Sequence, residues 1–158
     1  MTSPTIRRAG PEAGGVCRGI LQTLPEWFGN AEARRSHAEA AARGPSWVAS
    51  ERGAPLGLLT LARPTEAARD VHLLAVRRDR HRRGVGRALL ATAEEAARRE
   101  GARCLTVRTL GPSAPSPAYE GTRAAHEALG FVPLAELRGV WEDMPMLPMC
   151  KAIEEDAR

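Results

Sequence analysis

The segment Val71–Leu90, VHLLAVRRDRHRRGVGRALL, carries the most informative pattern in this chain of 158 residues. Apolar residues typical of a strand run into a turn rich in arginine, and Gly84-Val85-Gly86 then opens an amphipathic helix. The first N–H groups of a helix have no intrahelical partner and carry partial positive charge, so an anion binds well there. Glycines let the backbone approach a ligand closely. The segment therefore predicts a site for a phosphate-bearing ligand.

Two better-known glycine motifs do not match this segment. A P-loop needs a lysine directly after its last glycine, and Lys151, near the C-terminus, is the only lysine in the chain. A dinucleotide-binding fingerprint needs a third small residue at the position that Leu89 occupies. A simpler interpretation stays open at this point, in which a basic loop caps a helix and its arginines are solvated.

The same residues resemble the cofactor-binding motif of the GNAT superfamily of acyl-CoA-dependent N-acetyltransferases. The motif reads Gln/Arg-x-x-Gly-x-Gly/Ala at a strand-to-helix junction, and the resemblance extends to Leu129-Gly130-Phe131-Val132-Pro133. The chain departs from the motif at His81, where the family has Gln or Arg. Because backbone amides make most phosphate contacts at such a site, we expect cofactor binding to survive this change. The resemblance implies acetyl-CoA as the cosubstrate.

The resemblance also implies which residues bind acetyl-CoA. The end of the strand contributes Leu74, Ala75 and Val76, and the N–H of Val76 or of a neighbour is implied as the donor to the thioester oxygen. Guanidinium groups suit phosphate because their planar N–H forks match its oxygens. The loop and first helical turn contribute His81, Arg82, Arg83, Gly84, Val85, Gly86 and Arg87.

Amide formation requires a way to take the proton from the amine. In GNAT relatives this role falls on strand positions four and six before Val76, which are His72 and Asp70 here. Alternate residues of a strand share a face, so the carboxylate could orient the imidazole and raise its pKa. The alternative is that Asp70 begins the strand at the surface and that His72 is a hydrogen-bonded edge residue.

The position that usually supplies the proton to the leaving thiolate is a second point at which the chain departs from the family. Relatives usually carry Tyr four positions before the Gly-Phe pair, and His126 fills that position here. Tyr119, the only tyrosine, lies seven residues earlier on a similar face of the expected helix. His126 is therefore a candidate acid, with Tyr119 or water as alternatives. His126 could equally pack beside the cofactor without a chemical role.

Residues that would frame the amine acceptor come from the first helices and the last strands in this superfamily. The resemblance places Glu26, Trp27 and Phe28 in that region, together with Trp141 and Glu142. Large aromatic side chains are often simply part of a core. No pattern identifies the amine.

Strand and helix patterns alternate along the whole chain. Asn30 and Ser116 are predicted N-caps, and Gly44-Pro45 and Gly130 are predicted helix ends. The pattern predicts a mixed α/β, GNAT-like fold, with a mostly antiparallel twisted sheet of six to seven strands, about four helices and one domain over residues 1–158. The expected strands are Thr5–Ala9, Trp47–Ser50, Leu56–Leu61, Val71–Val76, Cys104–Leu110, Phe131–Glu136 and Leu147–Ala152, and the expected helices are Glu12–Leu24, Asn30–Arg43, Arg87–Glu100 and Pro117–Leu129.

Composition restricts the class of protein. The hydrophobic content of 43% is ordinary for a globular protein, and the sequence has neither a run long enough to span a membrane nor a signal peptide. We therefore expect a cytoplasmic protein without a membrane partner. Three scattered cysteines predict neither a disulfide framework nor a zinc site, and no metal is expected.

The sequence as a whole predicts a bacterial N-acetyltransferase. It would move an acetyl group from acetyl-CoA to a primary amine of a small molecule or peptide, by direct attack in a ternary complex. One alternative is a CoA-binding sensor or partner domain without catalysis, since the usual tyrosine is missing. Another is a basic nucleic-acid-binding module, but the net charge of +4 is spread along the chain and few aromatic residues could stack on bases. A homodimer through an edge strand is also expected.

Overall fold

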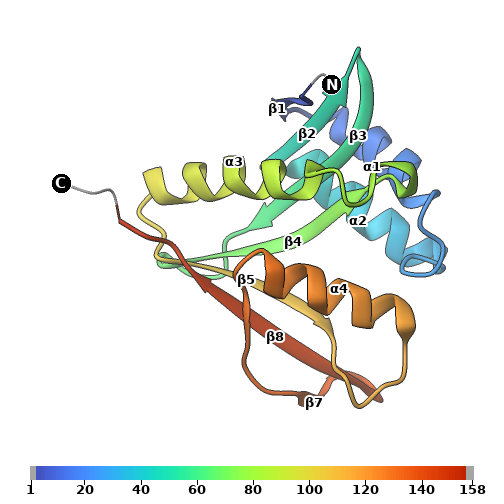
Figure 1. Cartoon of the computed structure of the whole chain (residues 1–158), viewed down its shortest axis with the longest axis vertical. Helices are drawn as coiled ribbons and strands as arrows, with labels where there is room; N and C mark the ends of the chain where they lie inside the picture. The colour runs from blue at the N-terminus through green and yellow to red at the C-terminus, as the bar shows by residue number, and fades with distance from the viewer. Residues whose placement is uncertain (1–2, 156–158) are drawn as a thin grey trace. The chain divides into compact units, whose positions relative to one another are not determined.

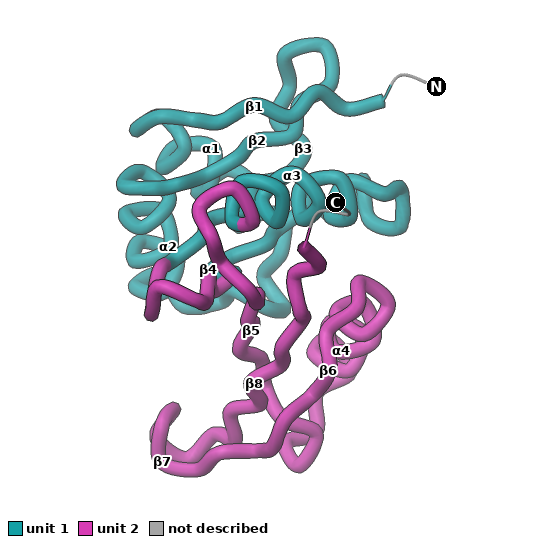
Figure 2. Tube along the Cα trace, turned by 90° about the vertical axis from the view of Figure 1, so that its left-hand side faces the viewer, with its two compact units in different colours: residues 1–62, 71–97 teal, residues 63–70, 98–158 magenta. Residues whose placement is uncertain are grey.

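The computed structural model describes residues 3–155. The chain divides into two compact units, which Figure 2 colours separately. Unit 1 comprises Met1–Ala62 and Val71–Ala97, and unit 2 comprises Arg63–Asp70 and Arg98–Arg158. The two units are described one at a time below, and the single domain over residues 1–158 stays a prediction.

Unit 1 combines an antiparallel sheet with helices. Strand β1 pairs with β2, and β2 pairs with β3 across a tight turn in which Arg52 and Gly53 both have positive φ. Figure 1 shows α1 and α2 on one side of β2 and β3, with α3 on the other. The elements are β1 (Thr5–Ala9), α1 (Ala13–Leu21), α2 (Ala31–Arg43), β2 (Ser46–Glu51), β3 (Ala54–Ala62), most of β4 (Ala68–Val76), the 3₁₀ turn η1 (Arg78–Arg80) and α3 (Val85–Arg99).

The core of unit 1 forms where α1 and α2 pack on the sheet. Asn30 caps α2 as predicted, because its Oδ1 accepts from the N–H groups of Glu32 at 2.8 Å and Ala33 at 3.3 Å. Gly14 lets the two helices approach closely, since a Cβ there would lie 3.1 Å from the carbonyl oxygen of Ala38. The buried core residues are Ala13, Cys17, Ile20, Leu21, Leu24, Ala38, Ala41, Val48, Leu58, Leu73 and Ala75.

Unit 2 is built around strand β8. Its elements are the first residues of β4, β5 (Cys104–Leu110), α4 (Pro117–Ala128), β6 (Val132–Pro133), β7 (Leu137–Trp141) and β8 (Met144–Ala152). Strand β8 pairs antiparallel with β5, β6 and β7, and Ala68–Asp70 pairs parallel with residues 104–106 of β5. Ser116 caps α4 as predicted, and Pro117 occupies its first turn.

A buried arginine anchors the start of β4 in unit 2. The Arg69 side chain is 2% exposed and donates to Glu100 Oε2 from Nη2 at 3.0 Å and from Nε at 3.2 Å. Its Nη1 donates to the carbonyl oxygens of Thr65, Glu66 and Ala68. Each of the three nitrogens of this buried guanidinium therefore has a hydrogen-bond partner, as burial of a charge requires.

The predicted fold class is confirmed: four α-helices accompany an eight-stranded, mostly antiparallel sheet in the described residues. The strand expected over Phe131–Glu136 is shorter than predicted and covers Val132–Pro133. Leu134 N–H still donates to the Pro148 carbonyl oxygen at 3.0 Å, but Pro148 has no N–H with which to return the bond. Strand β7 was not predicted, since its turn to β8 uses Glu142 with positive φ rather than the usual Asn-Gly pair. Helix α3 begins at Val85, one half-turn earlier than predicted.

Candidate active site

The loop between β4 and α3 has the backbone shape that the glycine motif predicts. The 3₁₀ turn η1 reverses the chain, and Arg82 and Gly84 follow with φ of 62° and 81°. The carbonyl oxygen of Gly84 accepts the first helical hydrogen bond, from Ala88 N–H at 3.0 Å. The N–H groups of residues 85–87 therefore lie in the first turn of α3, where an anion would meet them.

The two motif glycines differ in what their conformation requires. Gly84 occupies the left-handed region, and no atom of the protein lies within 4 Å of a Cβ added there. A Cβ on Gly86 would lie 3.9 Å from Val76 Cγ2 and 4.0 Å from Leu74 Cδ2, which is ordinary van der Waals contact. Packing within the protein thus does not exclude a side chain at Gly86. The backbone conformation accounts for the glycine at position 84, whereas a ligand on this surface would account for the one at position 86.

A third glycine seats α3 on the sheet. A Cβ on Gly57 of β3 would come within 3.1 Å of the Ala75 carbonyl oxygen, 3.1 Å of Leu89 Cδ1 and 3.2 Å of Val85 Cγ1. Its absence lets the helix pack tightly beside the end of β4. Val85 is consequently buried.

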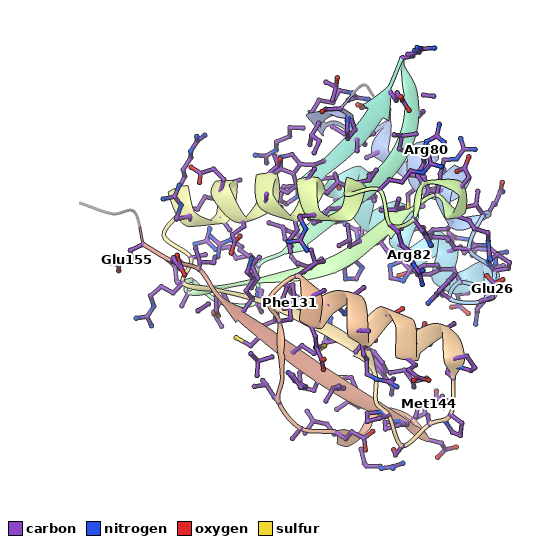
Figure 3. The ribbon with its side chains drawn as sticks, in the orientation of Figure 1. Glu26, Arg80, Arg82, Phe131, Met144 and Glu155 are labelled. Carbon is purple, nitrogen blue, oxygen red and sulfur yellow. The ribbon has the colours of Figure 1, made fainter. Side chains whose placement is uncertain are left out.

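The arginines of this loop fall into two groups. Arg77, Arg78 and Arg80 form ion pairs with Asp79, Glu26 and Glu51, respectively. Arg82 and Arg83 are exposed and have no ion pair within residues 3–155. Figure 3 shows Arg80 and Arg82 on the loop that precedes α3. Arg82 and Arg83 are also the two arginines that directly precede Gly84, and their predicted contact with the cofactor stays a prediction.

His81 bonds back to the strand that precedes the loop. Its Nε2 lies 2.7 Å from the carbonyl oxygen of Val76, and because a carbonyl only accepts, Nε2 carries the proton. The next N–H, that of Arg77, donates to the Leu56 carbonyl oxygen at 2.8 Å. Both polar groups of the Val76–Arg77 peptide are therefore fixed. The sequence placed His81 near the cofactor but gave no sign of this bond.

The segment Thr23–Phe28 contacts the same loop. Arg78 Nε donates to the Thr23 carbonyl oxygen at 3.2 Å, and its guanidinium lies 5.9 Å from the centroid of the Trp27 ring. The Trp27 ring also meets the His81 imidazole edge-on, with centroids 6.1 Å apart. Glu26 and Trp27, which the resemblance places around the acceptor, thus contact residues of the predicted cofactor loop.

His72 lies beside a second histidine of unit 1. The rings of His72 and His37 have centroids 5.2 Å apart, and His37 meets the Phe28 ring at 5.5 Å. Burial, and secondly the charge of His72, lower the pKa of His37 below its usual value. The sequence offered no signal for His37, since it lies far from His72 along the chain. The closeness of His37 to His72 is a result of tertiary packing.

Asp70 is buried in unit 2. Thr106 Oγ1 donates to Asp70 Oδ1 at 2.7 Å, and Arg108 Nη2 lies 3.5 Å from Oδ2. The side chain of Asp70 is 9% exposed. The alternative in which Asp70 begins the strand at the surface is therefore wrong. Its predicted role in orienting His72 stays a prediction.

Helix α4 carries both candidate proton donors. Tyr119 lies in its first turn and His126 in its last turn. Burial raises the pKa of Tyr119, so its phenol stays protonated at neutral pH. Burial lowers the pKa of His126, whose ring packs on Phe131 with centroids 5.9 Å apart. His126 is therefore mostly neutral at pH 7, which disfavours an imidazolium donor.

A cavity of about 330 Å³ lies elsewhere on unit 1. It contains none of the predicted site residues. Its lining residues are Arg18, Gln22, Ala31, Arg34, Arg35 and Glu39, from α1, α2 and the segment between them. In residues 3–155 there is no group of three or more His, Cys, Asp or Glu side chains placed to hold a metal ion. No helix in that range has the length and apolar character needed to cross a membrane.

Solved structures share this fold. A GNAT-family protein from Desulfovibrio desulfuricans has a TM-score of 0.81 and 22% identity, with 96% of this chain and 100% of that chain covered. An aminoglycoside 6'-N-acetyltransferase complexed with coenzyme A has a TM-score of 0.74 and 16% identity, over 98% and 99% of the two chains. The ribosomal-protein-S18-alanine N-acetyltransferase from Escherichia coli gives 0.73 and 18%, over 98% and 97%. These identities support the fold alone.

Comparison of the sequence itself gives two results. No curated protein matches it. The model of the acetyltransferase (GNAT) family matches residues 17–131, which is more than half of the chain and includes the loop between β4 and α3. The resemblance inferred from the glycine motif is confirmed, and so is the enzyme class: the chain belongs to the GNAT family of acetyltransferases.

Proposed function

We propose that this protein transfers the acetyl group of acetyl-CoA to a primary amine by direct attack in a ternary complex. The observation that carries the proposal is the loop from η1 to α3. It combines a left-handed glycine, the N-terminus of a helix and two exposed arginines that have no acidic partner in residues 3–155. These features suit the diphosphate of CoA, which needs N–H donors and positive charge. One structural neighbour was solved with coenzyme A.

The reaction forms a C–N bond and breaks a C–S bond. The neutral amine attacks the thioester carbonyl carbon, the carbonyl oxygen takes up negative charge, and CoA leaves as a thiolate. A backbone N–H at Val76 or its neighbour would stabilise the oxyanion. The end of β4 is well suited to this role, since hydrogen bonds from His81 and to Leu56 fix the adjacent peptide. The attacking nitrogen then loses a proton, and the thiolate gains one.

His72 is the proposed acceptor of the amine proton, directly or through water. A neutral imidazole is required for this step. The His72 ring lies beside that of His37 in unit 1, with ring centroids 5.2 Å apart. Asp70 is proposed to orient the His72 imidazole. Its carboxylate accepts a hydrogen bond from Thr106 and forms an ion pair with Arg108.

Tyr119 is the proposed donor to the leaving thiolate. Burial raises its pKa, so it holds a proton at neutral pH, whereas burial leaves His126 mostly neutral. His126 stays the alternative donor, as does water. The acceptor is proposed to be an amine of a small molecule or peptide. A cytoplasmic location and a homodimer are further parts of the proposal, and light scattering of the purified protein tests the dimer.

Isothermal titration with acetyl-CoA, CoA and ATP in moderate salt tests the proposal. We expect both CoA ligands to bind and ATP to bind far more weakly. An amine panel, read by release of free thiol, would then identify the acceptor class. Binding of CoA without turnover on a broad panel would favour the sensor alternative. Failure of all three ligands to bind would refute the assignment of the loop.

A further inference from the structure

The residue that departs from the family motif has a specific contact in this structure. His81 donates from Nε2 to the Val76 carbonyl oxygen at 2.7 Å. The 3₁₀ turn Arg78–Arg80 makes this bond possible, because it folds residue 81 back onto the end of β4. Its backbone bonds are from Arg80 N–H to the Arg77 carbonyl and from His81 N–H to the Arg78 carbonyl.

The bond completes the support of one peptide group. The Val76–Arg77 peptide has a carbonyl held by His81 and an N–H held by the Leu56 carbonyl at 2.8 Å. A peptide plane is rigid, so fixing both of its polar groups fixes its orientation. It is joined directly to the residue whose N–H is the proposed oxyanion donor. Loss of the His81 bond would leave the plane held from β3 alone.

The His81 imidazole also contacts a segment that lies earlier in the chain, between α1 and α2. Trp27 meets the His81 ring edge-on at 6.1 Å and lies 5.9 Å from the Arg78 guanidinium. Arg78 is in turn bonded to Thr23 and paired with Glu26. The position of His81 therefore depends on the segment Thr23–Phe28 as well as on its own loop.

We infer that His81 is a positioning residue for the thioester, acting through the Val76 peptide, and that Trp27 holds it in place. This inference rests on the proposed function, because it assumes that acetyl-CoA occupies the loop. It assigns His81 to the acetyl end of the cosubstrate rather than to its phosphates. The two roles make different predictions for acetyl-CoA and for CoA, since CoA lacks the thioester carbonyl.

The experiment compares the dissociation constants of acetyl-CoA and CoA in the wild type and in His81→Ala, measured by isothermal titration. We expect His81→Ala to weaken the binding of acetyl-CoA about fivefold more than the binding of CoA, the scale of one misaligned hydrogen bond. The ratio of the acetyl-CoA dissociation constant to the CoA dissociation constant should therefore rise about fivefold. His81→Gln supplies an amide N–H donor in place of the imidazole N–H, and it should bring the ratio of the two dissociation constants back toward the wild type. Trp27→Leu should change the ratio in the same direction by a smaller factor.

The matched control is Arg83→Ala, in the same loop. It removes a charge proposed to meet phosphate, so both ligands should weaken by the same factor. The inference would be overturned if His81→Ala left the ratio of the two dissociation constants unchanged, whether both ligands bound more weakly by the same factor or both bound as in the wild type. A His81→Gln variant that behaves like His81→Ala would also overturn it. A wild-type protein that binds neither ligand refutes the proposed function instead. Circular dichroism of each variant checks folding, and His81→Gln and Trp27→Leu still decide the matter if His81→Ala misfolds.

Discussion

Helix α3 of unit 1 and helix α4 of unit 2 both follow an irregular loop, but they are packed differently. Helix α3 buries Val85, Leu89, Leu90, Ala93 and Ala97 on one face. Helix α4 has no fully buried residue along its described length. Ser116 caps its N-terminus, and Arg123 Nη1 donates to the Leu110 carbonyl oxygen at 2.7 Å. The cofactor loop thus leads into a rigid element, whereas the candidate proton donors lie on a more weakly packed one.

The two helices also differ in how much the sequence alone can say about the candidate site residues that they carry. A helix N-terminus offers backbone groups whose positions follow from the local motif, so Gly84 and Gly86 could be interpreted without knowing the fold. The roles of Tyr119 and His126 depend on side-chain environment, which a half-buried helix face leaves open. Four predictions test the contrast, in order of decreasing expected effect.

The largest effect is expected for Gly84→Glu. The substitution places a negative charge at a helix N-terminus proposed to meet phosphate, and it strains a φ of 81°. We expect CoA affinity to fall about 100-fold or more, the scale of losing several charge-assisted contacts. Gly139→Glu is the matched control, because Gly139 of unit 2 has φ of 83° and equally open surroundings. Titration with CoA measures both, and equal losses in the two variants would contradict the loop assignment.

The packing contrast is tested with two leucines. Leu89 of α3 is 0% exposed, and Leu129 at the end of α4 is half-buried. We expect Leu89→Ala to lower the free energy of unfolding by about 3 kcal/mol and Leu129→Ala by about 1 kcal/mol, since the cost follows the buried volume removed. Urea denaturation followed by circular dichroism gives both values. Similar losses would mean that α4 is packed as firmly as α3.

The two candidate donors of α4 are separated by their effect on turnover. With an amine found by the panel, Tyr119→Phe should lower kcat about tenfold while leaving CoA affinity unchanged, because general acid catalysis contributes at least this much where water is a poor substitute. His126→Ala should lower kcat less. The opposite order would reassign the role to His126, and no change in either variant would leave the thiolate to water.

The smallest effect concerns pH and compares one histidine from each unit. Burial lowers the pKa of His37 and of His126, and His72 lowers that of His37 further. The unfolded chain therefore binds more protons near and below the unfolded pKa of 6.5, so the free energy of unfolding should fall as pH drops from 7.5 to 5.5. His37→Phe and His126→Phe should each flatten this dependence in thermal melts. A slope unaffected by both variants would exclude these side chains as its source.

The sequence also predicted more of unit 1 than of unit 2 at the level of the fold. The caps at Asn30 and Ser116 and the ends at Gly44 and Gly130 were correct, because capping is a local property of the chain. Strand β7 was missed, since its two-residue turn has no typical turn sequence. The sequence could not predict that Asp70 contacts Thr106 and Arg108, or that His72 lies beside His37, because these partners come from other elements of the fold.

By itself, the sequence determined the family, the fold class and the position of the glycine-containing turn between a strand and a helix. These depend on periodicity, on caps and on a glycine motif, all of which act over a few neighbouring residues. Only the tertiary structure decided which arginines keep a free charge, because Glu26 and Glu51 come from distant segments to pair with Arg78 and Arg80. It also decided what His81 contacts. A hydrogen bond depends on distance and direction in space, and the sequence gives neither for residues brought together by folding.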